Sequence, residues 1–283
     1  MKKFFLRIFL VGTLILVNSS YGKDIPASPL EKPGWKLDFH DEFDGPELNE
    51  KIWLPYYLPH LTTREKAAAD YEFRDGAIVI KIEKDHPAYR DDWGNKEKGH
   101  MLVSSIQTFE KDGLHAKAKD GHHEPEFDGY TTKYGYFEIR AKIPGGSGGH
   151  AAWWMVGCQD KPNQNAEWDL MENAFGNTEK MYAHIIPWND KSIHYEKWRG
   201  PIGFDLADEW HIYGFEWDAD GMRLFIDNKE VASTKQSIDY RMMTFLSLYR
   251  NCAWDGKNDG IYPKEFMVDY FRVYKKESST ADN

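Results

Sequence analysis

The chain has 283 residues and a formal net charge of −10, with 46 Asp and Glu against 36 Lys and Arg. This acidic balance disfavours a nucleic-acid partner, because nucleic acids are bound through clustered basic residues. Aromatic residues make up 15% of the chain, and its 11 Trp and 16 Tyr suit both core packing and stacking on the apolar faces of sugar rings.

The N-terminal residues 1–22 do not resemble part of a fold. A basic start, Met1–Lys3, precedes an apolar run, Phe4–Val17, and small residues follow at Ser20 and Gly22. These are features of a secretory signal peptide, and the run is too short for a stable membrane span. An uncleaved membrane anchor is the alternative. We expect cleavage, giving a secreted, periplasmic or extracellular protein with no membrane partner and a monomeric state.

Residues 23–283 are predicted to form one all-β domain with its core at about 33–276. Short alternating or apolar runs separated by turn residues are typical of an antiparallel sandwich. Three dipeptides mark hairpin turns, namely Asp75-Gly76, Asp220-Gly221 and Asp227-Asn228, and residues 64–72 suit a turn or two of helix. In chain order, strands are expected within 35–45, 71–84, 100–108, 134–144, 150–157, 166–173, 180–188, 209–233, 242–249 and 265–276.

Two segments break this rhythm. Residues 109–132 form a long polar loop, which in a compact domain is functional or disordered. A metal site is conceivable there, but the spacing fits no metal pattern, and solvated side chains are the favoured interpretation. The residues concerned are His115, His122, His123, Glu124, Glu126 and Asp128. Residues 277–283 are predicted to be a disordered tail.

The two cysteines, Cys158 and Cys252, do not make a disulfide-dependent scaffold. In an exported protein they could pair, and two buried thiols are the equal alternative.

The segment "EWDLME" carries the clearest chemical signal. On a regular strand Glu167 and Asp169 share a face, whereas Glu172 points to the other. A β-bulge at Leu170-Met171 would add one residue and return Glu172 to the face of the other acids. Two adjacent carboxyl groups, one ionised and one protonated, are what retaining glycoside hydrolysis needs. A solvent-facing acidic strand without function is the alternative.

At this point the sequence resembles glycoside hydrolase family 16, whose signature Glu-x-Asp-x-x-Glu is met by "EWDLME". Flanking segments match in order: "DFHDEFDG", "SSIQT", "YGYFEIRAKIP", "AAWWMVG", the 208–231 hairpin and "FMVDYFRVYK". The resemblance implies a β-jelly-roll of two curved antiparallel sheets with the substrate on the concave face. It also implies a secreted, endo-acting, retaining β-glycosidase that needs no cofactor. Glu167 would be the nucleophile, Glu172 the general acid/base, and Asp169 would orient the nucleophile.

Departures from the family pattern bear on the substrate. Many β-1,3-glucan-cleaving members carry Gly-Leu-Trp-Pro-Ala-Phe-Trp before the catalytic strand, where this chain has "GGHAAWW" ending at Trp154. The first tryptophan of that run aligns with His150. This change disfavours simple laminarin cleavage. The family's Asn-Asn-Glu run is also replaced, near "TTREKAAADYE", and the 109–132 loop would be an insertion beside the cleft. Together these departures favour a β-galactan or another galactose-containing glycan over a β-1,3(4)-glucan. A non-catalytic lectin on the same fold and a transglycosylase are the alternative functions.

Further residues follow from strand parity and the resemblance. Substrate contacts are expected from His150, Trp154, His184 and Trp188, although core roles remain open for the last two. Glu138 and Arg140 would share a face and hold the catalytic carboxylates, or form a structural ion pair. Trp168 would face the core. Family members often bind a structural calcium, for which Glu42 and Asp269 are the matching acids.

Overall fold

The computed structural model describes residues 24–90, 92–95, 99–117, 123–173, 176–207, 209–252 and 254–277. The predicted signal peptide, His122 and all but the first residue of the predicted tail lie outside these ranges. Among the residues described, no helix is long and apolar enough to span a bilayer.

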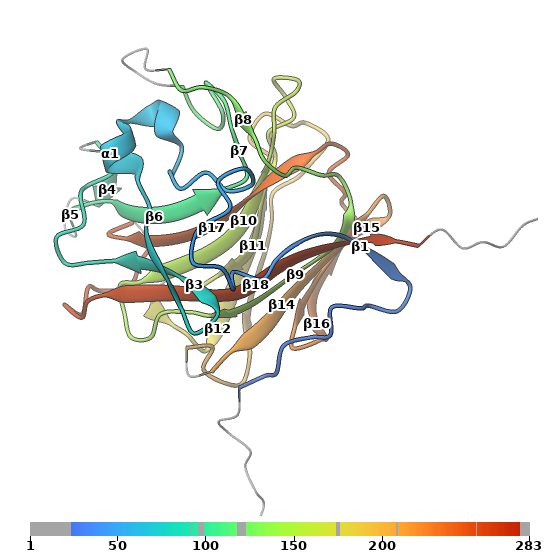
Figure 1. The fold of residues 1–283 in the computed structure, drawn as a ribbon. Coiled ribbons are helices and arrows are strands. Elements are labelled where there is room, and N and C mark those ends of the chain that lie inside the picture. The colour runs from blue at the N-terminus through green and yellow to red at the C-terminus, as the bar shows by residue number, and fades with distance from the viewer. Residues whose placement is uncertain are drawn as a thin grey trace, which may run out of the picture.

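The described chain is an all-β sandwich of two large antiparallel sheets, which Figure 1 shows as successive layers. The eight-stranded sheet has the order β16-β15-β14-β9-β18-β3-β2, with β1 also paired to β18. Its strands are β1 (Trp35–Asp41), β2 (Asp70–Arg74), β3 (Ala77–Ile82), β9 (Gly135–Lys142), β14 (His211–Asp218), β15 (Gly221–Ile226), β16 (Lys229–Thr234) and β18 (Lys264–Lys276). The expected fold class is confirmed.

The six-stranded sheet, which carries the acidic segment, has the order β13-β12-β11-β10-β17-β6. Its strands are β6 (Leu102–Gln107), β10 (His150–Gly157), β11 (Glu167–Glu172), β12 (Lys180–Ile186), β13 (Glu196–Pro201) and β17 (Met242–Arg250). The short pairs β4 (Gly94–Asn95) with β5 (Gly99–His100), and β7 (Phe109–Glu110) with β8 (Phe127–Asp128), lie apart from it. Two short helical pieces, η1 (Pro59–Leu61) and α1 (Arg64–Ala67), lie before β2.

The turn residues explain how the strands connect. Asp75 and Gly76 both take positive φ (55° and 77°), as do Asp227 and Asn228 (50° and 63°). Two consecutive left-handed residues are the requirement of a type I′ hairpin turn, so these two predicted hairpins are confirmed. The pair β7–β8 lies inside the predicted long loop, so that loop contains a small hairpin-like sheet.

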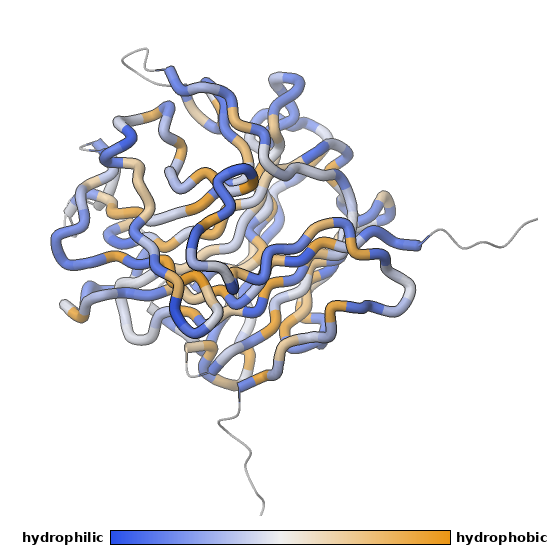
Figure 2. Tube along the Cα trace, in the orientation of Figure 1, coloured by the Kyte–Doolittle hydropathy of each residue, from blue (hydrophilic) through white to orange (hydrophobic). Residues whose placement is uncertain are grey.

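The main core lies between the two large sheets and is built from alternate residues of their facing sides. Trp153 and Trp168 from the six-stranded sheet are buried with Phe215 and Phe271 from the other. Figure 2 shows hydrophobic segments in the interior and hydrophilic ones along the loops. A second apolar cluster, which includes Tyr57, lies on the opposite side of the six-stranded sheet. The segments before β2, between β3 and β6, and after β6 therefore form a wall over that face.

Candidate active site

The bulge in β11 brings the three acids to one face. Against β10, Trp153 pairs with Met171 and Trp154 with Asp169, which leaves Leu170 as the extra residue. Against β12, Asp169 pairs with His184 and Glu172 with Tyr182, so three steps on β11 match two on its neighbour. This shift reverses the side-chain alternation, and the predicted bulge is confirmed.

The other face of β11 belongs to the core. Trp168, Leu170 and Met171 are at most 5% exposed and pack in the inter-sheet cluster. The Trp168 ring lies 5.3 Å from Phe215 of the opposite sheet, as expected from strand parity. The position of the acids is therefore fixed by apolar burial on the reverse side of the same strand.

The three acids lie at the floor of a cleft of about 640 Å³. Glu167 and Asp169 are only 8% and 6% exposed. The cleft is lined by Tyr57, Trp93, Met101, His115, His150, Ala152, Trp154, Glu167, Asp169, Glu172, His184, Ile186, Trp188, Tyr195, Arg199, Tyr249, Cys252 and Trp254. Aromatic walls around buried carboxyl groups are a typical setting for binding a sugar chain.

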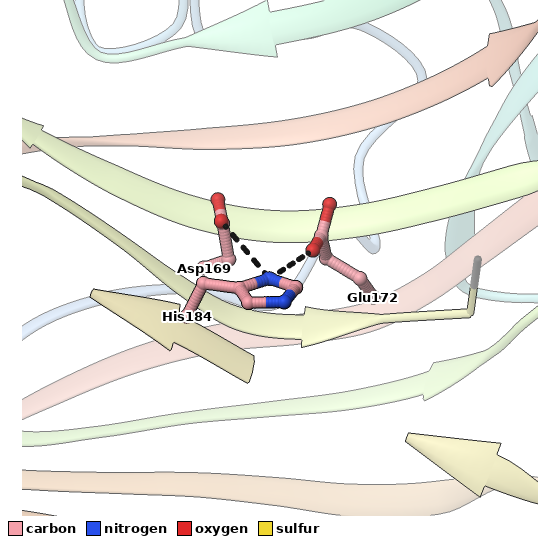
Figure 3. Close-up of side chains that lie close together, drawn as sticks. All are labelled: Asp169, Glu172 and His184. Carbon is pink, nitrogen blue, oxygen red and sulfur yellow. Dashed lines mark hydrogen bonds and ion pairs between the residues drawn. The ribbon is translucent and has the colours of Figure 1, made fainter. Parts of the chain in front are cut away.

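Glu172 is held between two imidazoles. Nε2 of His150 lies 3.0 Å from Oε1, and Nδ1 of His184 lies 3.0 Å from Oε2. Figure 3 shows the His184 ring between Asp169 and Glu172. Burial opposes ionisation of Glu172, but the hydrogen bonds and charges of the two histidines outweigh it and lower its pKa to about 2.

Glu167 has the opposite electrostatic bias. Burial, and then the charge of Asp169, raise its pKa to about 8, against the opposing effects of His115 and Trp188. The Trp188 indole donates a hydrogen bond of 2.9 Å to Oε2 of Glu167, and His115 Nδ1 lies 3.6 Å from the same atom. Trp188 follows Pro187 in a left-handed backbone conformation (φ 44°) that directs its ring to the cleft.

Asp169 lies between the two glutamates and hydrogen-bonds Glu167. Burial and the adjacent Glu172 carboxylate raise the pKa of Asp169 well above its usual range. Their hydrogen bond raises the pKa of Glu167 and lowers that of Asp169, which is the effect of a protonated Glu167 donating to Asp169. In the empty cleft, these effects favour a proton on Glu167 and an ionised Glu172.

The grouping of Asp169, Glu172 and His184 does not need a metal ion. One ligand-type atom from each lies within 4.8 Å of the others. His184 Nδ1 contacts Asp169 at 3.5 Å and Glu172 at 3.0 Å, so these atoms satisfy one another directly.

The structure brings the predicted substrate residues His150, Trp154, His184 and Trp188 into this cleft. His184 contacts the acids, so it is not a packed core residue, and Trp188 is 53% exposed. Trp154 is 4% exposed, stacks on Phe245 at 3.8 Å and donates to Ser247, so its ring forms a rigid part of the wall.

Glu138 and Arg140 do not hold the catalytic carboxylates, and that prediction is wrong. Their strand, β9, lies between β14 and β18 in the eight-stranded sheet, not in the sheet of the acids. Glu138 accepts from the Tyr270 hydroxyl at 2.8 Å, and Arg140 donates to the carbonyl of Ile25.

The predicted calcium acids are both paired with arginine. Arg272 donates two hydrogen bonds to Glu42, and Arg140 donates one of 2.8 Å to Asp269. Because each carboxylate already neutralises a cation, this pair does not fit a calcium site.

Cys158 and Cys252 are buried thiols and not a disulfide. This resolves the alternative that the sequence left open.

Sequence reasoning missed several cleft residues. Tyr249 could have been found from parity, because it pairs with His150 across β10 and β17. His115, Tyr195 and Trp254 come from irregular segments, and Arg199 comes from the edge strand β13, which was not predicted. Tyr57, Trp93 and Met101 reach the cleft from the wall over this sheet.

Comparison with known proteins matches this geometry to one family. The model described as Glycosyl hydrolases family 16 matches residues 107–272. The chain belongs to this family. The match spans the acids of β11, their neighbours on β10 and β12, and strand β17. It therefore covers most of the cleft floor.

Several relatives are similar over most of this chain. A solved structure of a GlcNAcα1-4Gal-releasing endo-β-galactosidase from Clostridium perfringens is 38% identical, with a TM-score of 0.83, over 90% of this chain and 65% of that one. A β-glucanase from Rhodothermus marinus is 27% identical over 65% of this chain and 76% of its own length. A glucan endo-1,3-β-glucosidase A1 from Niallia circulans is 25% identical over 86% of this chain but only 38% of its own.

Proposed function

We propose that this chain is a retaining endo-β-glycosidase. The observation that carries the proposal is the bulged strand, which aligns Glu167, Asp169 and Glu172 on one face at the floor of an aromatic cleft. Retaining hydrolysis needs an ionised carboxylate that attacks the anomeric carbon and a protonated carboxyl that protonates the leaving oxygen. Glu167 is assigned as nucleophile and Glu172 as general acid/base.

The reactive state requires a proton on Glu172 and an ionised Glu167. Reaching that state moves one proton from Glu167 to Glu172 without net uptake. Asp169 and the indole of Trp188 both hydrogen-bond Glu167, and the indole donates to its ionised form, which orients it for attack.

After the first step, Glu172 has lost its proton and can act as the base. It takes a proton from an incoming water, whose oxygen attacks the anomeric carbon of the glycosyl-Glu167 ester. Configuration at the anomeric carbon is retained because it is inverted twice. No cofactor enters these steps.

We propose a galactose-containing glycan as the substrate, with a β-1,3(4)-glucan as the alternative. The endo-β-galactosidase noted above is similar to this chain at 38% identity. The axial 4-hydroxyl of galactose leaves one ring face apolar, which suits stacking on exposed aromatic side chains. Trp188, Tyr195 and Trp254 are 53%, 56% and 49% exposed around the cleft.

The test is product analysis by mass spectrometry over a panel of laminarin, lichenan, agarose, carrageenan, keratan sulfate and mucin O-glycans. We expect internal cleavage of a galactose-containing member, with the β-anomer formed first in a proton NMR time course. A first-formed α-anomer would refute retention. Cleavage of the glucans alone would refute the substrate assignment but leave the enzyme class intact.

A Glu167→Gln variant separates the enzyme from a lectin on the same fold. For an enzyme, the variant loses hydrolysis but still binds the substrate glycan in calorimetry. If wild type binds a glycan tightly and cleaves none, the lectin reading replaces the proposal. Added sugar acceptors distinguish hydrolysis from transglycosylation, since transfer gives products longer than the substrate.

We propose that the protein is exported and acts as a monomer. The support is the basic and apolar segment at 1–22. Cell fractionation with N-terminal sequencing of the mature protein checks export, and light scattering during gel filtration checks the monomer.

A further inference from the structure

His150 lies beneath the cleft, between the general acid/base and two residues of the segment after β17. It is 1% exposed. Nε2 faces Glu172 Oε1 at 3.0 Å. Nδ1 has two neighbours, Trp254 Nε1 at 2.9 Å and Asp255 Oδ1 at 3.3 Å. The charge of His150 therefore depends on whether Nδ1 accepts a hydrogen bond from Trp254 or carries a proton that faces Asp255.

The Trp254 contact fixes the position of the His150 proton. An indole N–H is only a donor, so Nδ1 must accept at 2.9 Å and carries no proton. A neutral imidazole then has its proton on Nε2, from which it donates to Glu172. If both ring nitrogens were protonated, the Nδ1–H and indole N–H groups would face each other.

Asp255 favours the opposite state. It is 5% exposed, and its second oxygen accepts from the Cys252 backbone N–H at 2.8 Å. Its carboxylate would stabilise a proton on Nδ1. Burial opposes a charge on His150, whereas hydrogen bonds with Asp255 and Glu172 favour it and raise the His150 pKa. The indole N–H directed at Nδ1 opposes this proton.

The charge of His150 matters because Glu172 must carry a proton when the leaving oxygen departs. The other titratable groups near this pair are His184 from β12, Asp169 from β11 and Tyr249 from β17. None of them distinguishes the two forms of His150 by direct contact with Nδ1. An imidazolium 3.0 Å from Glu172 would hold the carboxyl ionised, whereas a neutral Nε2–H donor leaves it able to accept a proton.

We propose, on the basis of the proposed glycosidase function, that Trp254 is a positioning residue for the acid/base Glu172. Its indole N–H keeps His150 neutral against Asp255, and this allows Glu172 to hold the catalytic proton. Trp254 is also 49% exposed on the cleft wall, so the same ring can contact the glycan. Because Glu172 is the residue affected, loss of the indole N–H should appear in the alkaline limb of the pH–rate profile.

Trp254→Phe is the direct kinetic test, because it keeps an aromatic ring and removes the N–H. Asp255 then becomes the partner of Nδ1, His150 becomes charged, and Glu172 loses its proton at lower pH. We expect the alkaline limb of kcat/KM to move down by about 1–3 pH units, the effect of an opposite charge at this distance. At pH 7.5 kcat should fall at least about tenfold, with a smaller change in KM.

Trp254→Phe/Asp255→Asn is the restoring variant. An asparagine amide keeps an acceptor for the Cys252 N–H and turns an N–H toward Nδ1, so His150 is neutral again. The alkaline limb of kcat/KM should then return to its wild-type position. Trp210→Phe is the matched control. That ring lies 4.7 Å from Arg140, which belongs to the other sheet, and its replacement should not move the limb. An unmoved limb in Trp254→Phe, with only KM raised, would overturn the proposal.

A readout without turnover separates this proposal from the proposed function. Long-range ¹H–¹⁵N spectra of the imidazole should show His150 neutral and Nε2-protonated in wild type between pH 6 and 8, and imidazolium in Trp254→Phe. An imidazolium in wild type would refute the proposal even if hydrolysis is found. If no glycan is cleaved, the proposed function fails, and these spectra still decide the state of His150.

Discussion

Replacing Glu172 with Gln tests which glutamate is the nucleophile and which is the acid/base. The test is needed because the empty cleft favours a proton on Glu167 and a charge on Glu172, the reverse of the state that reacts. The amide is nearly isosteric and can accept from His150 as the carboxylate does. It cannot supply a proton to the leaving oxygen. General acid catalysis contributes about 10²–10⁴-fold. The expected loss corresponds to about 2.7–5.4 kcal/mol of barrier height.

The loss should depend on the leaving group. A natural sugar leaving group needs protonation, so kcat/KM for the glycan should fall by about 10²–10⁴-fold. An aryl glycoside with an acidic phenol leaves without help, so its first step should be nearly unaffected. The second step lacks its base. The glycosyl-enzyme should therefore accumulate and appear in intact mass spectra, with the added mass on the peptide of Glu167.

Glu167→Gln gives the complementary result, since without a nucleophile both substrates should be lost and no adduct should form. Glu196→Gln is the matched control, because this glutamate is exposed on β13 and does not line the cleft. If Glu167→Gln keeps aryl glycoside activity and Glu172→Gln loses it, the roles are exchanged. The chemistry would then follow the charge distribution of the empty cleft, and the assignment made here would be refuted.

Three further predictions concern single contacts. In Trp188→Phe, loss of the N–H that opposes the raised pKa of Glu167 should move the acid limb of kcat/KM up by about one pH unit. Burial opposes ionisation of Glu42, but Arg272 outweighs it and lowers the pKa of Glu42 in the folded state. The pair therefore stabilises the fold at pH values above the unfolded-state pKa of Glu42, and this stabilisation is lost as the pH falls through the folded-state pKa. Glu42→Gln should therefore lower the free energy of unfolding, measured in urea, by about 1 kcal/mol at pH 7 and leave it unchanged at strongly acid pH. Added calcium should change the stability of the variant and of wild type equally. Burial raises the pKa of Cys158 to about 12, so a thiol reagent should react with Cys158 only after denaturation, and because Cys158 and Cys252 form no disulfide, a reductant should not change the melting temperature.

The acidic strand could be predicted because its signal is local. Glu167 and Glu172 can share a face only if one residue is added between them, and this constraint places the bulge without knowledge of any neighbour. The same holds for Asp75-Gly76, where two residues suited to positive φ define a hairpin. Local chemistry was sufficient for both features.

The incorrect and missed site residues are those whose position depends on which strands are neighbours in a sheet. Parity correctly put Glu138 and Arg140 on one face of β9, but parity does not say to which sheet a strand belongs. Trp254 and His115 lie on irregular segments without a period, so their approach to the cleft depends on the whole chain path. Arg199 lies on a strand whose glycine and proline hid its conformation.

The left-handed backbone of Trp188 also has a consequence for engineering. A non-glycine residue at φ 44° is strained by about 1 kcal/mol or more, and the strain persists here next to the nucleophile. Replacement by Gly or Asn would relax the backbone while removing both the stacking ring and the N–H to Glu167. Selection for thermal stability alone would therefore favour Gly or Asn at position 188 and give a more stable protein with lower activity.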